Sequence, residues 1–310
     1  MKLKAVMYHY VRNTEETPYK CIHAVREDNF IQQVNFLKAN YEMATSESIK
    51  DFLIGKYKPK KDMAVLTFDD GLKEHGIFVT EVLAKHGIQG QFFVPTACIT
   101  EGYVLPVHKN HFLLASLNFS YYQERVIEVL KENYPDTSIE VDDQRAARTY
   151  RWDSKEVARF KYLLNYQLPK PVRNHILKII FEQELGRETD FAKSLYLSWE
   201  EIKEMQRKGM TIGGHSHRHD VLSSLSNEEQ TLELATCLEL LNKNIVNQSI
   251  FPFSYPFGKM STFNEHTIDC LKKHHVQYAY STVIGDSISS TNPFILKRID
   301  PKDLEITKKY

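Results

Sequence analysis

Short apolar runs alternate with amphipathic stretches along the N-terminal part of the chain. Runs bounded by polar or turn residues predict buried strands at residues 3–7, 63–66 and 91–94. The stretches near them predict helices at residues 30–39, 47–55 and 79–86. Strands that alternate with helices in this way are typical of a parallel sheet or barrel.

The alternation stops at about residue 105 and resumes at about residue 196. Two capping boxes then predict helix starts, and a strand at residues 210–213 lies between them. The boxes are Ser198 with Glu201 and Ser226 with Glu229. The intervening segment is mostly helical in pattern. We therefore predict an α/β core of residues 1–104 and 196–310, interrupted by a helical insertion of residues 105–195.

Two adjacent carboxylates, Asp69 and Asp70, follow the second apolar run. Neighbouring strand residues point to opposite faces, so both acids serve one site only if the chain bends there, and Gly71 permits the bend. Two buried acids are costly unless a cation neutralises them. A metal ion would satisfy one and leave the other free to take a proton. The alternative is a helix N-cap, in which the acids only start the helix that follows.

Three histidines lie within the five residues from His215 to His219. His215 and His219 are four apart, so one helical turn would place both rings on one face, a spacing typical of metal ligands. Two imidazoles and one carboxylate make a three-ligand site with open positions. Ser216 stands where metalloprotease motifs have their glutamate, so the base must come from elsewhere, and Asp69 is the candidate. The alternative is a polar loop of solvated histidines, and His217 is expected to be a bystander.

Thr67-Phe68-Asp69-Asp70-Gly71 together with His215-Ser216-x-x-His219 resembles the polysaccharide deacetylase family, the NodB-homology enzymes of carbohydrate esterase family 4. The resemblance implies a distorted (β/α) barrel with fewer than eight strands. It implies that Asp70, His215 and His219 hold a divalent ion, with zinc favoured and iron, cobalt or nickel as alternatives. It further implies that Asp69 takes a proton from water during amide hydrolysis, giving acetate and an amino sugar.

Two family motifs are altered in this chain. Ser254-Tyr255-Pro256-Phe257 resembles the third motif, R-x-P-[YF], with serine in place of arginine. In the family a backbone N–H of this turn helps to bind the oxyanion, which here would be that of Phe257. The late leucine-x-histidine motif falls at residues 296–298, where Arg298 replaces the histidine. In the family the arginine of the third motif orients the base carboxylate, and Arg298 is the candidate substitute that would partner Asp69.

The general acid has to come from elsewhere, because the family's late histidine is replaced. His9, at the end of the first predicted strand, is the candidate, with another histidine as the alternative. Some rearranged members of the family take this acid from the first strand. The structural alternative for His9 is a hydrogen-bonded histidine under a loop.

Composition gives information on the class of protein and on the cellular compartment in which it is expected. Lys plus Arg and Asp plus Glu are both 40, which gives no overall signal for nucleic acid or membrane binding. The four cysteines have no paired spacing, and the first residues hold too short an apolar run for a signal peptide. No stretch is apolar and long enough to span a membrane. We therefore expect a cytoplasmic enzyme.

The predicted insertion is basic between residues 145 and 178, with nine Lys and Arg residues against two acids. Arg151, Lys155 and Arg159 recur at four-residue steps and are expected to share a helix face. This face is a candidate contact for the diphosphate of a nucleotide- or lipid-linked sugar, or for the surface of an anionic membrane. The alternative is an ordinary solvated face. His108 and His111, three apart, are expected to belong to a solvated helix start.

These observations predict a metal-dependent N-deacetylase that acts on an N-acetylated sugar. The sugar is expected to be linked to a nucleotide or lipid carrier, as a precursor of surface polysaccharide. One alternative is a metal-dependent hydrolase of another amide or imide. The other is a binding protein that keeps the fold without activity, for which the two altered motifs are the argument.

Overall fold

The computed structural model describes residues 1–137 and 140–304. The chain forms two compact units. The barrel unit contains Met1–Asn13, His23–Glu101 and the described residues from Lys193 onward, and the helical unit contains Thr14–Ile22 and Gly102–Ala192. The sequence places residues 14–22 with the core, whereas in the structure Tyr19 packs edge-on against Phe112, 4.7 Å between ring centres. The assignment of separate domains stays a prediction.

Eight strands of the described residues form one sheet, and every strand pairing is parallel. The strands are β1 (Leu3–Tyr8), β2 (Glu42–Met43), β3 (Met63–Phe68), β4 (Gln91–Val94), β5 (Thr211–Gly214), β6 (Pro252–Ser254), β7 (Tyr278–Ile284) and β8 (Leu296–Arg298). Seven follow the order β1-β3-β4-β5-β6-β7-β8, and β2 pairs with the start of β3. Val6 bridges Ile299, just after β8, so the sheet closes on its first strand. The expected distorted (β/α) barrel is confirmed, and its path has seven strands, because β2 lies off that path.

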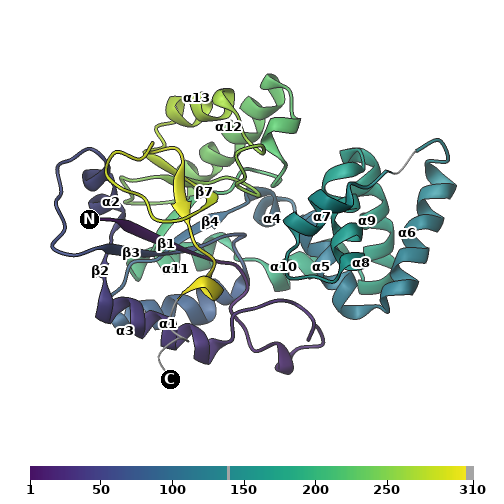
Figure 1. The fold of residues 1–310 in the computed structure, drawn as a ribbon, viewed down its shortest axis with the longest axis horizontal. Helices are drawn as coiled ribbons and strands as arrows, with labels where there is room; N and C mark the ends of the chain where they lie inside the picture. The colour runs from purple at the N-terminus through teal and green to yellow at the C-terminus, as the bar shows by residue number, and fades with distance from the viewer. Residues whose placement is uncertain (138–139, 305–310) are drawn as a thin grey trace. The chain divides into compact units, whose positions relative to one another are not determined.

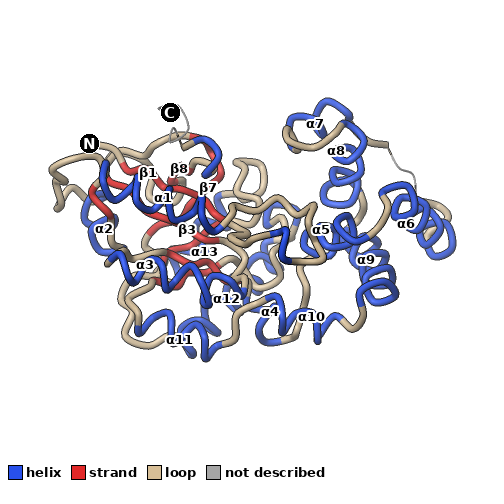
Figure 2. The backbone as a smooth tube through the Cα atoms, turned by 90° about the horizontal axis from the view of Figure 1, so that it is seen from below, coloured by secondary structure: helices blue, strands red, loops and turns tan. Residues whose placement is uncertain are grey.

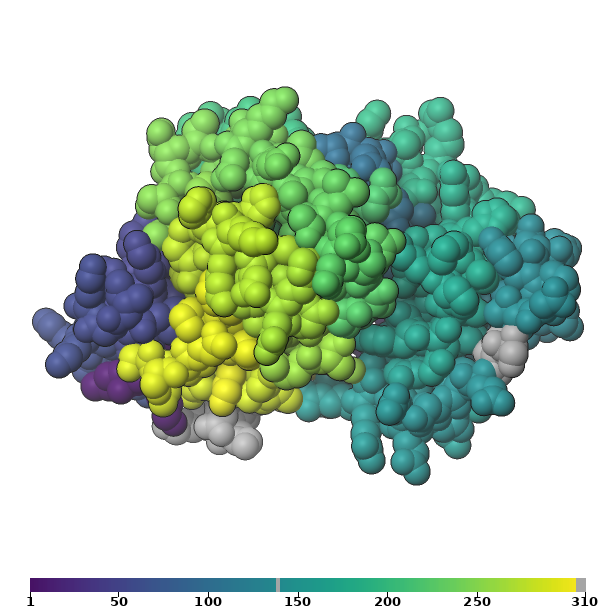
Figure 3. Space-filling view, turned by 90° about the horizontal axis from the view of Figure 1, so that it is seen from above, coloured from purple at the N-terminus to yellow at the C-terminus, as the bar shows by residue number. Residues whose placement is uncertain are grey.

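Helices surround the strands of the barrel unit (Figures 1 and 2). They are α1 (Glu27–Asn40), α2 (Ser46–Leu53), α3 (Thr80–His86), α4 (Thr96–Thr100), α11 (Trp199–Arg207), α12 (Asn227–Asn244) and α13 (Glu265–Lys273). A π-helical turn, His75–Val79, precedes α3. Both predicted capping boxes are present, at the starts of α11 and α12. The chain after α11, coloured green to yellow, forms most of this unit's surface in Figure 3.

Alternate residues of the strands belong to two different apolar clusters. Met63 and Val65 of β3 pack with Leu296 of β8 in a cluster that draws on the strands and on α2. Ala64 and Leu66 pack in a larger cluster that includes buried residues of α1, α3, α11, α12 and α13. Because side chains alternate across a strand, the first cluster is the barrel interior and the second lies between the strands and the helices.

Gly213 of β5 lets its neighbours approach closely inside the barrel. A Cβ atom there would lie 2.4 Å from the carbonyl oxygen of Pro252 and 2.7 Å from the ring of Phe93. Phe93 belongs to the interior cluster, so the missing side chain of Gly213 leaves the space that this ring fills. The close packing fixes the position of β5, the strand that leads to His215.

The helical unit contains the helices α5 (Pro106–Ser116), α6 (Phe119–Asn133), α7 (Asp143–Thr149), α8 (Lys155–Tyr162) and α9 (Lys170–Leu185), and the start of α10 (Glu188–Leu195). Two expectations are wrong here. Arg151 does not share a helix face with Lys155, because α8 begins at Lys155 with Ser154 as its N-cap. His108 is not solvated, because α5 buries its side chain. None of the helices that the structure describes combines the length and apolar character that crossing a bilayer requires.

Candidate metal centre and active site

The predicted site residues gather at one rim of the barrel. Parallel strands all end at the same rim, which is where barrel enzymes carry their catalytic groups. Four of the predicted residues directly follow or end strands: His9, Asp69, His215 and Arg298. Tyr8 of β1 is in register with Phe68 of β3, and the amide of Asp69 donates to the carbonyl of Tyr8 at 2.9 Å. This register brings His9 beside Asp69.

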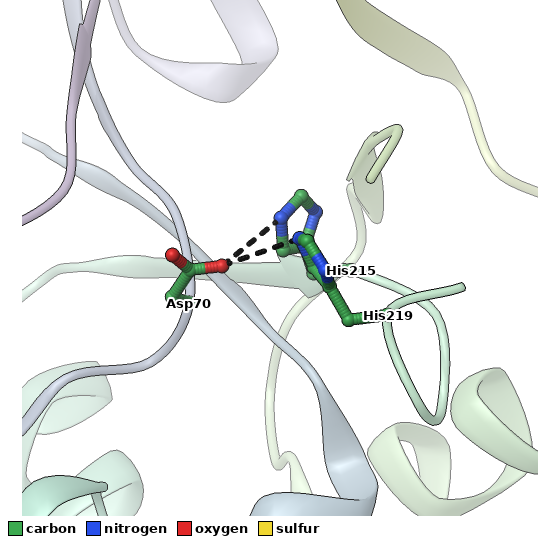
Figure 4. A group of neighbouring side chains, drawn as sticks. All are labelled: Asp70, His215 and His219. Atoms are coloured by element: carbon green, nitrogen blue, oxygen red, sulfur yellow. Dashed lines mark ion pairs between the residues drawn. The ribbon is translucent and has the colours of Figure 1, made fainter. Parts of the chain in front are cut away.

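Asp70, His215 and His219 form a buried three-residue group (Figure 4). One ligand atom from each lies within 4.8 Å of the others. The Oδ1 atom of Asp70 is 3.4 Å from Nε2 of His215 and 3.5 Å from Nε2 of His219. Two ligand atoms that are each about 2.1 Å from a tetrahedral zinc ion lie about 3.4 Å apart. The spacing and the donor types therefore fit a divalent ion.

A hydrogen bond sets the tautomer of His215. Its Nδ1 atom is 2.6 Å from the carbonyl oxygen of Ser254. A carbonyl oxygen only accepts, so Nδ1 carries the hydrogen and Nε2 presents its lone pair toward Asp70. Histidine ligands of metals are commonly oriented in this way by a backbone carbonyl. Burial by itself would lower the pKa of His215, but the carboxylates of Asp69 and Asp70 outweigh it and raise that pKa. A proton and a metal ion thus compete for the same nitrogen.

Residues 215–219 do not form the expected helical turn. The segment is a loop in which Ser216 and His219 both have a φ of +59°. The hydroxyl of Ser216 accepts a hydrogen bond from the amide of His219 at 2.9 Å, which closes the loop. The rings of His215 and His219 still meet, with centres 4.7 Å apart. The four-residue spacing correctly predicted that the two rings lie together. A tight loop brings them together, however, and not the helical turn that the spacing suggested.

Strained backbone gathers at this site. Six non-glycine residues of the described chain have a positive φ, and four of them are site residues: Asp70, Ser216, His219 and Phe257. L-residues pay for this conformation, and such strain is found preferentially where function requires it. The bend predicted at the acidic pair is present, since φ is +75° at Asp70 and +60° at Gly71. It turns Asp70 toward the histidines.

Asp69 forms a buried ion pair with Arg298. The guanidinium donates from Nη1 to Oδ1 at 2.9 Å, and Nη2 lies 2.9 Å from Oδ2. The Asp69 and Arg298 side chains are only 2% and 1% exposed. Asp69 continues the interior positions 63, 65 and 67 of β3, and Arg298 stands two residues after the interior Leu296. Strand alternation therefore points both side chains into the barrel interior, at the rim where the strands end.

Ser254 supplies a second contact to the same carboxylate. Its hydroxyl donates to Oδ2 of Asp69 at 3.2 Å, while its carbonyl holds His215. Burial alone would raise the pKa of Asp69, but the charges of Arg298 and His215 outweigh it and lower that pKa below its usual value. Asp69 is therefore ionised near neutral pH and can accept a proton.

His9 and Phe257 both lie near the group. The charge of His9 is one of those that lower the pKa of Asp69. The ring of Phe257 is 5.0 Å from the ring of His219, centre to centre, and its φ is +61°. These positions agree with the residues named from the sequence, while the roles of His9 as acid and of the Phe257 N–H at the oxyanion stay predictions.

The sequence reasoning missed the residues that hold the histidine loop in place. His217 is buried between the hydroxyl of Thr96 and the carboxylate of Glu101, each at 2.8 Å from one ring nitrogen. Glu233 of α12 accepts a hydrogen bond from the amide of Arg218. His217 therefore lies outside the three-residue group, as expected, but it fixes the loop to α4. The only signal in the sequence is its place between two ligand candidates.

Part of the chain matches a known protein family. Residues 167–279 match the family described as polysaccharide deacetylase. This segment includes His215, His219 and Phe257, and it excludes Asp69 and Asp70. The chain is also 29% identical over 104 residues to YxkH of Bacillus subtilis (strain 168), whose name assigns it provisionally to the polysaccharide deacetylases. The matched part covers 34% of this chain and 36% of YxkH.

Solved deacetylase structures match nearly the whole chain. The Streptococcus pyogenes deacetylase PplD, in complex with acetate, is similar with a TM-score of 0.61 and 17% identity, over 98% of this chain and 96% of PplD. A de-N-acetylase from Aggregatibacter actinomycetemcomitans is similar with a TM-score of 0.56 and 14% identity, over 97% and 96%. At this identity the likeness concerns the fold. The expected resemblance to polysaccharide deacetylases is confirmed.

Proposed function

We propose that this chain, which resembles polysaccharide deacetylases in sequence over residues 167–279 and in fold throughout, is a metal-dependent hydrolase that removes acetyl groups from an N-acetylated sugar. One observation carries the proposal. Asp70, His215 and His219 make a metal-type donor group, and an ionised carboxylate, Asp69, directly precedes one of them. A base next to a Lewis-acid site is what amide hydrolysis requires.

Asp70, His215 and His219 would hold a divalent ion, most simply zinc, since two imidazoles and a carboxylate are zinc ligands in known hydrolases. When bound, such an ion polarises a carbonyl and lowers the pKa of water. Iron, cobalt and nickel also accept these donors. Ser254 keeps the His215 nitrogen available by fixing the proton on the other ring nitrogen.

Asp69 acts as the general base that takes a proton from the attacking water. Its Arg298 and Ser254 partners hold the carboxylate in one orientation and keep it ionised before the reaction. The Phe257 N–H donates to the oxyanion that forms from the acetyl carbonyl. His9 gives a proton to the nitrogen of the leaving amine, so that the C–N bond breaks to yield acetate and an amino sugar.

Metal content is the first test of this proposal. Wild-type protein supplied with zinc, cobalt or nickel is expected to carry near-stoichiometric metal by elemental analysis, and His215→Ala is expected to carry only background metal. The variant removes one of three ligand atoms and leaves two donors. His274→Ala is the matched control, because His274 follows the last residue of α13 and lies outside the group. Wild type without metal would contradict the proposal and favour a binding protein that keeps the fold without activity.

We further propose that the sugar is attached to a diphosphate, as in nucleotide- or lipid-linked precursors. The support is the basic segment of residues 145–178 in the helical unit. Part of its charge is paired: Arg159 contacts Asp143 at 2.9 Å, and Lys161 contacts Asp153 at 2.8 Å. Asp143 lies just before the segment, so a charge count within it overstates the net charge. Lys155 also lies 3.9 Å from Asp143, but its side chain is 80% exposed. The exposed side chains of Arg151 and Lys155 are therefore the better candidates for phosphate contact.

Charge reversal tests whether the substrate carries a diphosphate. The double variant Arg151→Glu/Lys155→Glu is expected to raise KM for a diphosphate-linked N-acetyl sugar about three- to tenfold, because exposed charge pairs contribute modestly. Acetate release from the same sugar without the diphosphate is the control and is expected to keep its KM. An unchanged KM for the diphosphate-linked sugar would remove the carrier from the proposal and leave deacetylation untouched.

A further inference from the structure

A buried histidine holds the segment that carries His9. His75 begins the π-helical turn His75–Val79, four residues after Gly71. Its Nε2 atom lies 2.8 Å from the backbone carbonyl oxygen of His9. The His75 side chain is fully buried, at 0% exposure. Single π-helical turns within helices are rare and occur frequently at functional sites.

The protonation of His75 follows from this contact. Because a carbonyl oxygen only accepts, Nε2 carries the hydrogen and donates to His9. Burial lowers the pKa of His75, so the ring is neutral. Its Nδ1 atom is buried and has no hydrogen-bond partner among the described residues. The ring packs against Phe68 and Phe92, which stack on each other, with centres 5.5 and 5.8 Å away. His75 thus spends its only donor on the His9 carbonyl.

Neighbouring contacts hold the rest of this segment. Arg12 donates two hydrogen bonds of 2.7 Å to the carboxylate of Glu74, the residue before His75. On the other side, Val25 exchanges backbone hydrogen bonds with Tyr10 and Arg12, each 3.0 Å long. These contacts fix residues 10–12. The hydrogen bond from His75 reaches the backbone of His9 itself.

We propose that His75 is a positioning residue, which orients the His9 imidazole so that it can protonate the leaving amine. The inference rests on the proposed function, because it needs His9 as the proton donor. Proton transfer requires hydrogen-bond geometry, and small displacements of a catalytic group lower the rate steeply. His75 and the Asp69-Asp70 pair flank the same turn after β3. One turn therefore carries the base and also fixes the acid.

Amide and activated-ester substrates separate this role from simple packing. An amine must be protonated to leave, whereas the nitrophenolate of 4-nitrophenyl acetate leaves without a proton. His75→Phe keeps an aromatic ring against Phe68 and Phe92 and removes the donor. We expect it to lower kcat for de-N-acetylation about 10- to 100-fold, with less than about a twofold change in ester hydrolysis and with metal content unchanged. His75→Gln, which places an amide N–H near the Nε2 position, is expected to recover most of the lost rate.

A double-mutant cycle with His9 completes the test. In a His9→Ala background, His75→Phe is expected to cause no further loss of amide hydrolysis, because the group it positions is gone. Val79→Ala, in the same π-helical turn, is the control for general loosening and is expected to leave the ratio of amide to ester turnover unchanged. Three results would each overturn the inference. They are equal losses with both substrates, rate losses from His9→Ala and His75→Phe that multiply, and full activity of His75→Phe.

Nitrogen NMR of the His75 ring gives a readout that does not depend on activity. We expect the neutral tautomer with hydrogen on Nε2, and a hydrogen on Nδ1 would overturn the inference. Failure of the proposed function looks different, since wild-type protein would then release no acetate from any N-acetyl sugar tested. The two failures are therefore distinguishable.

Discussion

Asp69→Asn is expected to lower the turnover of an N-acetylated sugar about 10²- to 10⁴-fold, the usual contribution of a general base, while metal content stays at the wild-type level. Asparagine keeps the shape of the side chain and cannot take the proton from water. The three candidate ligand atoms belong to Asp70, His215 and His219, so the change leaves them in place. Acetate release and elemental analysis on the same preparation measure both results.

The buried guanidinium complicates this variant and needs its own control. Asp69→Asn leaves the charge of Arg298 without its carboxylate, in a place where that side chain is 1% exposed. Asp69→Asn/Arg298→Met removes both charges and is expected to restore stability without restoring turnover. Asp70→Asn removes a candidate ligand and is expected to lose metal as well as turnover. Near-normal turnover in Asp69→Asn would mean that another group is the base.

Arg298→Met is expected to lower the free energy of unfolding by about 3–5 kcal/mol near neutral pH, the typical cost of leaving one partner of a buried ion pair alone. The reason is that Asp69 would remain buried with Ser254 as its remaining close partner. Chemical denaturation at several pH values measures the effect. Arg298→Lys keeps a charge but not the planar fork, so it is expected to fall between wild type and Arg298→Met.

The pH dependence gives this prediction its sign. Burial alone would raise the pKa of Asp69, and Arg298 and His215 together lower it. In wild type the stabilisation is therefore present above the unfolded pKa of about 3.9 and is lost as pH falls below it. In Arg298→Met the guanidinium no longer offsets burial, so the pKa of Asp69 rises. Stability then falls as pH rises from the unfolded value toward this raised pKa, because burying the ionised carboxylate opposes folding. The difference from wild type should shrink toward acidic pH, and a constant difference would contradict this explanation.

The sequence was sufficient to predict the barrel and the members of the metal group. The apolar runs mark β1, β3 and β4 because buried parallel strands have few polar positions. The capping boxes mark α11 and α12 because side-chain caps act over only three residues. Asp70, His215 and His219 were named because the acidic pair follows an apolar run, the two histidines are four apart, and both motifs resemble those of the deacetylases.

The contacts that orient these groups could not be predicted in the same way. Glu101 holds His217 from a position 116 residues away, and no local pattern marks either residue as a partner. Ser254 was named only as the replacement of an arginine, whereas in the structure its carbonyl and hydroxyl serve two different side chains. Arg298 is an intermediate case. Because side chains alternate along a strand, the Arg298 side chain is expected to point into the barrel as that of Leu296 does. Only the closure of the barrel places it against Asp69.

The position of Arg298 in the last strand sets the order in which the site can be assembled. β3, which carries Asp69, pairs with β1, and Val6 of β1 is joined to Ile299 only when the barrel closes. On the ribosome, the N-terminal strands emerge and can pair long before residue 298 has been synthesised. Throughout that interval Asp69 has no guanidinium to offset its burial. The nascent chain can therefore bury Asp69 in its ionised form only as the final strand docks, which makes C-terminal truncation more damaging to the site than the distance along the chain suggests.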